Sequence, residues 1–115
     1  MNLTRRPRRL RTTAAMRALT AETALRPEQL IQVFFVRDGI SEPQPISSMP
    51  GQYQHTLDSL IPAVRQAVEA GIKCIDLFGV PLDDDKDEIG SAAWDDNGIL
   101  NRAIAACRAD FGDEI

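Results

Sequence analysis

Few side chains in this sequence are of the types that perform covalent or acid–base chemistry. The 115 residues contain two lysines, Lys73 and Lys86, and one histidine, His55. A lysine forms a Schiff base only when its surroundings suppress its charge. Lys86 lies instead among Asp83, Asp84, Asp85, Asp87 and Glu88, whose carboxylates favour the protonated amine. Lys73 is expected to begin a strand. A lone histidine completes no triad at any spacing here, so we expect His55 in a turn or at the surface and no catalytic residue.

The acidic run and the two cysteines are the candidates for metal ligands. The run lacks the spaced oxygen ligands and the central glycine of a calcium loop, so we expect a solvated loop. Cys74 and Cys107 belong to no Cys-x-x-Cys or Cys/His cluster. We expect two buried free thiols in a reducing compartment. The sequence therefore predicts no metal-binding and no cofactor-binding residue.

Charge is divided unevenly along the chain. Residues 1–26 hold seven Arg and one Glu, a net +6, whereas residues 27–115 hold six Lys or Arg and sixteen Asp or Glu, a net −10. A basic segment of this kind binds nucleic acid or an acidic protein surface like the rest of this chain. No aromatic residue interleaves with the arginines, which favours the protein surface. A basic-armed nucleic-acid binder is the alternative.

Composition indicates an ordinary soluble chain, with 43% hydrophobic and 26% charged residues. No apolar run approaches the roughly 20 residues that cross a bilayer, and no apolar region follows the arginines as in a secretory signal. We expect a cytoplasmic protein. An organelle-targeting peptide, which is also rich in arginine, is the alternative for the N-terminus.

Two apolar segments predict two buried parallel strands. The first is Leu30–Val36, and the second is Ile72–Pro81, which runs out into a functional loop at Gly79. Between and after them the spacing predicts helices at about Leu60–Ala70 and Ile99–Ala109. Their apolar stripes contain Leu60, Ile61, Val64, Ala67 and Val68 in the first and Ile99, Ala103, Ile104 and Cys107 in the second.

Capping residues and breakers set the ends of these elements. Ser59 is the predicted cap of the first long helix, which places Pro62 in its first turn, and Gly71 is its stop. Asn97 is the predicted cap of the second. A short helix is expected within Ala14–Thr23, and a turn or helix start at Pro27.

Two connections are long. Residues 40–54 hold three prolines and are expected to be irregular, and either functional or packed against a partner. Residues 82–96 form the acidic loop, in which Trp94 is expected to anchor packing, with a substrate lid as the alternative. Two parallel strands alone leave two open edges, so the chain is expected to open a larger α/β protein.

Four motifs occur in an order that resembles the N-terminal third of the porphobilinogen synthase (delta-aminolevulinic acid dehydratase) family, over residues 5–110. They are Arg6-Pro7-Arg8-Arg9-Leu10-Arg11, Ser48-Met49-Pro50-Gly51, Leu77-Phe78-Gly79-Val80-Pro81 and Lys86-Asp87-Glu88-Ile89-Gly90-Ser91-Ala92-Ala93.

The resemblance implies an α/β fold: a partial TIM (β/α)₈ barrel, consisting of the first two βα units (residues 27–115), preceded by an extended basic N-terminal arm (residues 1–26). Leu30–Val36 and Lys73–Phe78 would be the first two barrel strands. The arm would wrap a neighbouring subunit, commonly in an octamer.

The implied reaction is the condensation of two 5-aminolevulinate molecules to porphobilinogen, a hydro-lyase step of haem and tetrapyrrole synthesis. In the family, two lysines form Schiff bases and Zn²⁺ or Mg²⁺ assists. Those lysines and metal ligands would follow position 115, so we expect an N-terminal fragment that is inactive alone. A non-enzymatic assembly or regulatory fragment acting through its arm is the alternative. Gln54 and Val33 depart from the usual Arg and Pro of the family pattern.

Overall fold

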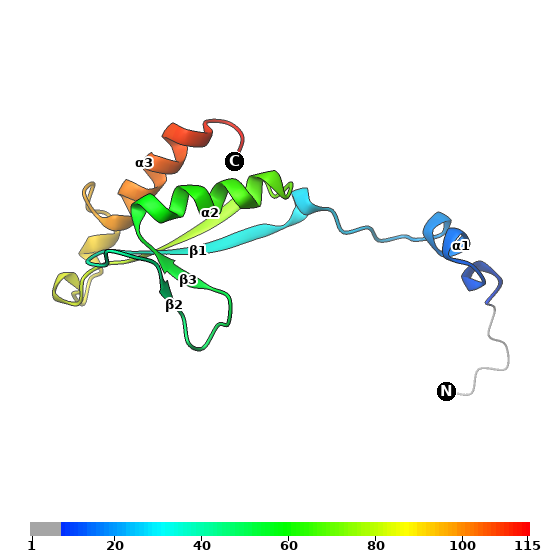
Figure 1. Cartoon of the computed structure of the whole chain (residues 1–115), viewed down its shortest axis with the longest axis horizontal. Helices are drawn as coiled ribbons and strands as arrows, with labels where there is room; N and C mark the ends of the chain where they lie inside the picture. Colours follow the sequence, from blue (N-terminus) through cyan, green and yellow to red (C-terminus); the bar gives the residue numbers. More distant parts are fainter. Residues whose placement is uncertain (1–7) are drawn as a thin grey trace.

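The computed structural model describes residues 8–115 as a four-stranded sheet with two long helices on one face and an N-terminal segment that extends away (Figure 1). In chain order the elements are the 3₁₀ turn η1 (Arg9–Arg11), α1 (Ala14–Leu19), η2 (Pro27–Gln29), β1 (Ile31–Arg37), β2 (Gln44–Pro45), β3 (Tyr53–His55), α2 (Leu57–Glu69), β4 (Cys74–Val80), η3 (Asp83–Asp85), η4 (Ser91–Ala93) and α3 (Ile99–Phe111). The strand order is β2-β3-β1-β4.

The two predicted strands pair side by side and parallel, as expected. β1 and β4 run in register from Ile31 opposite Cys74 to Arg37 opposite Val80. Both strands begin slightly later than predicted, so Lys73 precedes β4 rather than starting it. The α/β class is therefore confirmed, with α2 as the connection between the parallel strands.

The expectation that both strands are buried is wrong for one face of the sheet. Phe34 and Val36 of β1 lie in the core against α2 and α3, whereas Cys74, Asp76 and Phe78 of β4 are exposed. Both long helices cover the same face, and no described residue covers the other. Cys74 is thus an exposed free thiol instead of a buried one; Cys107 is buried and free, as predicted.

Residues 40–54, predicted to be irregular, contain two short strands. β3 pairs in parallel with β1 at Phe35 and Val36, and β2 pairs antiparallel with β3. The strand β2 has only two residues, one of them Pro45, so it shows no alternation of polar and apolar residues. The sequence therefore could not predict it. β1 therefore pairs with β4 along one border and with β3 along part of the other. Among residues 8–115, β4 has no partner on its outer border.

Helix α2 begins three residues earlier than predicted. Thr56 is its N-cap and accepts from the Ser59 backbone N–H at 3.1 Å, while Ser59 Oγ accepts from the Thr56 N–H at 3.0 Å. Ser59 is thus the second member of a capping box, and Pro62 lies inside the helix rather than in its first turn. The end is as predicted. Gly71, at φ 92°, terminates the helix, with Ile72 N–H bonded to Ala67 O at 3.0 Å.

Helix α3 also differs from its prediction at the start. Gly98, not Asn97, is the N-cap, and the Asn97 N–H donates instead to Asp95 Oδ1 at 2.9 Å. The buried stripe is Ile99, Ala103, Cys107 and Phe111. Ile104 is 49% exposed, because it lies about 100° around the helix from Ala103.

The N-terminal segment contains α1, within the range predicted for a short helix, and Thr13 caps it. From Arg8 to Leu30 every residue is exposed except the half-buried Met16. The chain extends 65 Å along its longest axis, with the helix α1 set apart from the sheet (Figure 1). The first arginines of the predicted arm, in residues 1–7, lie outside the described residues.

Candidate functional site at the carboxyl ends of the strands

The parallel strands β1, β3 and β4 place their carboxyl ends at one edge of the sheet. Asp38 follows β1, Thr56 follows β3, and Pro81 follows β4. In α/β proteins the loops at this edge form the ligand-binding and catalytic sites. This edge is therefore the candidate functional region of the chain.

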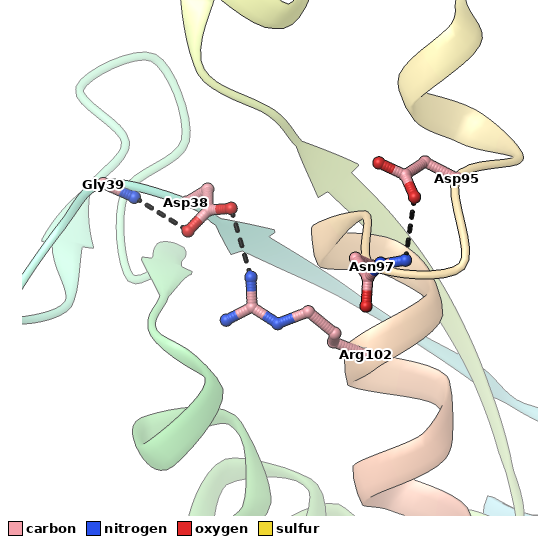
Figure 2. A network of polar contacts seen from close by, with 5 residues as sticks. All are labelled: Asp38, Gly39, Asp95, Asn97 and Arg102. Atoms are coloured by element: carbon pink, nitrogen blue, oxygen red, sulfur yellow. Dashed lines mark hydrogen bonds and ion pairs between the residues drawn. The ribbon is translucent and has the colours of Figure 1, made fainter.

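An ion pair ties the end of β1 to α3. Arg102 Nη1 donates to Asp38 Oδ2 at 3.2 Å, and the Gly39 N–H donates to Asp38 Oδ1 at 3.1 Å (Figure 2). The Asp38 N–H in turn donates to the Val80 carbonyl at 3.0 Å. Asp38 thus joins the ends of both long strands to the first turns of α3.

We expect Arg102→Ala to lower the free energy of unfolding by only about 0–1 kcal/mol, because exposed ion pairs contribute little. The Arg102 and Asp38 side chains are 43% and 36% exposed. Urea unfolding at low and high salt checks this, since the small effect should shrink further as salt screens the pair. A loss above about 2 kcal/mol would contradict a solvent-screened pair.

The acidic loop after β4 is organised by its own carboxylates. Lys86 pairs with Asp83, and this hydrogen bond and charge lower the pKa of Asp83. Hydrogen bonds from Ser91 lower the pKa of Asp87, whose Oδ1 accepts from the Ser91 N–H at 2.8 Å. Among residues 8–115 no three His, Cys, Asp or Glu side chains are grouped so as to hold a metal ion.

Trp94 does not anchor packing in this loop, contrary to the prediction. Its side chain is 64% exposed, after the turn η4. The chain is held here by polar contacts instead: Asn101 Nδ2 donates to the Asp95 carbonyl at 2.7 Å. Gly79 and Leu100 line a small cavity of ≈ 170 Å³ between this loop and β4.

His55 is half-buried at the end of β3 rather than in a turn. Its Nδ1 lies 3.3 Å from Ser59 Oγ, and burial lowers its pKa below the ordinary value. It lines a groove of ≈ 620 Å³ between β3 and α2. His55 directly precedes Thr56, and a prediction of Thr56 as the helix cap would have placed His55 at the end of a strand. The prediction of Ser59 as the cap placed it in a turn instead.

The comparisons decide the family. The family model of delta-aminolevulinic acid dehydratase matches residues 4–115. The chain belongs to this family. The delta-aminolevulinic acid dehydratase of Mycobacterium tuberculosis (strain H37Rv) is 56% identical over 108 residues, which are 94% of this chain and 33% of that protein. That of Streptomyces coelicolor is 54% identical over 110 residues, 96% of this chain and 33% of the relative.

A solved structure of a delta-aminolevulinic acid dehydratase shares the fold. The Toxoplasma gondii enzyme, crystallised in complex with its reaction product porphobilinogen, superposes with a TM-score of 0.89 at 36% identity. The alignment covers 96% of this chain and 31% of that one. The chain thus spans about a third of the length of its dehydratase relatives.

Proposed function

We propose that this chain forms the opening part of a porphobilinogen synthase, the lyase that condenses two 5-aminolevulinate molecules into porphobilinogen. The observation that carries the proposal is 56% identity to a delta-aminolevulinic acid dehydratase across 94% of the chain. The fold agreement with the Toxoplasma gondii enzyme supports it independently. No comparison supports the regulatory-fragment or nucleic-acid-binding alternatives.

In this proposal residues 27–115 are the first two βα units of a (β/α)₈ barrel, with β1 and β4 as adjacent barrel strands. The full parallel register of β1 and β4 supports it, as do the helices on a single face. The bare face would be the barrel interior. There Phe35 and Phe78 stack with ring centroids 5.5 Å apart, and Arg37 Nη1 donates to Gln54 Oε1 at 2.9 Å.

The role proposed for this segment is structural and not catalytic. The Lys86 amine lies in an exposed ion pair with Asp83, not in the water-excluding surroundings that a Schiff-base lysine needs. The described residues do not fit a metal, since they offer no cluster of three ligands. In this proposal residues 8–115 carry out neither a Schiff-base step nor a metal-assisted step. The family resemblance implies that the catalytic lysines and the Zn²⁺ or Mg²⁺ ligands would follow position 115.

A chimera tests the assignment. The segment of the Mycobacterium tuberculosis relative that aligns with this chain over 108 residues is replaced by this chain, and porphobilinogen formation from 5-aminolevulinate is measured. We expect the chimera to turn over substrate, because the segment supplies the same strands and helices. The 115-residue chain alone and the truncated relative alone, the two matched controls, should form no porphobilinogen.

Two outcomes contradict the proposal in different ways. A chimera that folds, by circular dichroism and gel filtration, yet forms no product would show that this segment does not replace its counterpart. Product formed by the 115-residue chain alone would show that it holds the catalytic groups itself. Either result is read against the intact relative, assayed in parallel.

The partner proposed for the arm, residues 1–26, is a neighbouring subunit of a homo-oligomer. Its net charge of +6 complements the −10 of residues 27–115, and its described residues are nearly all exposed. No helix in residues 8–115 combines the length and apolar character needed to cross a membrane. A cytoplasmic location is a separate proposal, which the similarity to bacterial dehydratases supports.

A further inference from the structure

His55 lies at the junction of β3 and α2, in contact with the residues that cap the helix. It directly precedes Thr56, the N-cap of α2, and its Nδ1 is 3.3 Å from Ser59 Oγ. Its ring meets Phe34 edge-on, with centroids 6.0 Å apart, and lies 6.3 Å from the Tyr53 ring. The imidazole is therefore held between aromatic side chains and the first turn of a helix.

The hydrogen bonds around Ser59 determine which form of His55 fits. Ser59 Oγ accepts from the Thr56 N–H at 3.0 Å and from the Thr56 hydroxyl at 3.2 Å. Those two bonds occupy both lone pairs of the oxygen, which leaves Ser59 its single hydroxyl proton to donate. The proton can go to His55 Nδ1 or to the Thr56 carbonyl at 3.3 Å. When Ser59 donates to Nδ1, the ring joins the network as the neutral tautomer that carries its proton on Nε2.

Protonation of His55 would put two donors face to face. The Nδ1–H of an imidazolium needs an acceptor, and Ser59 Oγ can provide one only by giving up a bond from Thr56. Those bonds form the capping box of α2. The positive charge would also lie at the helix N-terminus, which repels cations. The arrangement thus favours neutral His55 on two independent grounds.

We propose that His55 is a pH-sensitive control on the start of α2: the neutral ring completes the capping network, and the protonated ring breaks it. Opening of the first turn would loosen the link between α2 and β3. His55 and Ser59, with Phe34 and Tyr53, line the groove of ≈ 620 Å³ beside them, so the groove would change shape with pH.

The charged and titratable neighbours leave this direction unchanged. Tyr53 on β3 lies with its ring 6.3 Å from the imidazole, and Asp58 lies in the first turn of α2. Arg37 on β1 lies on the opposite face of the sheet, where its guanidinium donates to Gln54. Burial is the cause of the lowered pKa of His55, below its ordinary 6.5. Because the unfolded chain then binds the proton more tightly, stability should fall as the pH drops from 6.5 through the pKa of the folded protein.

Nuclear magnetic resonance of the 115-residue chain tests the proposal. His55 is the only histidine, so one imidazole titration between about pH 5 and 7.5 can be assigned without ambiguity. We expect the amides of Thr56 and Ser59 to shift with the same midpoint, below 6.5. Loss of a helix cap predicts a fall in hydrogen-exchange protection of the first turn of about two- to thirtyfold on the acid side.

Two variants make the result decisive. In His55→Gln, which stays neutral, the amide shifts and the loss of protection should disappear. In Ser59→Ala the imidazole should still titrate, while the Thr56 amide no longer follows it. The proposal is overturned when His55 titrates and the two amides do not, or when His55→Gln leaves their pH dependence unchanged. Should either variant fail to fold at pH 7.5, the coincidence of midpoints in the parent chain decides.

Discussion

Replacement of Gly79 by alanine is expected to lower the free energy of unfolding by about 3 kcal/mol, the upper range for overpacking. A Cβ at Gly79 would lie 2.7 Å from Leu100 Cβ and 3.2 Å from the Leu100 Cα and N. The last two atoms belong to the helix backbone, so relief requires α3 to move away from β4. Thermal unfolding by circular dichroism should show a midpoint roughly 10 to 20 °C lower.

A double-mutant cycle isolates the contact. Leu100→Gly removes the side chain that the new methyl group meets first, at its own cost of about 1 kcal/mol for glycine in a helix. In that background Gly79→Ala should cost at least about 1 kcal/mol less than in the parent chain. A Gly79→Ala protein within about 0.5 kcal/mol of the parent would show that α3 shifts freely, and would contradict the close approach.

Gly51→Ala is the control for the conformational effect of glycine. At Gly51 no atom of residues 8–115 beyond the adjoining residues lies within 4 Å of the added Cβ, but φ is +82°. Its cost should come from left-handed backbone alone, about 1–2 kcal/mol, and should not respond to changes in α3. The comparison separates the strain of a left-handed backbone at Gly51 from the steric overlap with Leu100 at Gly79.

Elements whose signals are local were predictable from the sequence. The β-branched and aromatic run of β1, the apolar stripe of α2 and the stop at Gly71 each lie within one segment, and the structure confirms them. The family resemblance rested on short motifs in the right order, and the comparisons confirm it. Such features depend on near neighbours in the chain and need no knowledge of the packing.

Features that depend on distant neighbours were not predictable. Asp38 and Arg102 are 64 positions apart, and no periodicity brings them together. The apolar run of β4 predicted burial on both faces, whereas Phe78 and Cys74 are exposed because only one face has helices against it. That run is what a strand of a closed barrel would carry, so the sequence describes the proposed larger fold better than this segment alone.

Some predictions were wrong because two residues of similar type competed for one role in capping or packing. Thr56 and Ser59 are both capping types, and only the reciprocal bonds show which one begins the helix. Ile104 and Phe111 are both apolar, yet Phe111 is buried and Ile104 is not. Trp94 has the size of an anchor, but the residue is 64% exposed within the described part of the chain. Residue type alone could not rank these alternatives.

Leu60→Ala is expected to lower the free energy of unfolding by about 2–5 kcal/mol, the range for truncating a buried leucine. Leu60 is fully buried, and it lies in the core with Val36 of β1 and Val64 of α2. Because a domain of this size has a total stability of about 5–15 kcal/mol, the loss is a large fraction of it. Urea unfolding should show a lower midpoint with an unchanged slope.

Ile104→Ala is the matched control, since it also truncates a large aliphatic side chain on a long helix. At 49% exposure it should cost less than about 1 kcal/mol in the 115-residue chain. Ile104 lines a groove of ≈ 480 Å³ along the outer border of β4. In the chimera with the Mycobacterium tuberculosis relative, a further strand at that border would bury the side chain, and the cost should rise toward that of Leu60→Ala. Equal small costs in both proteins would argue against a strand at this border.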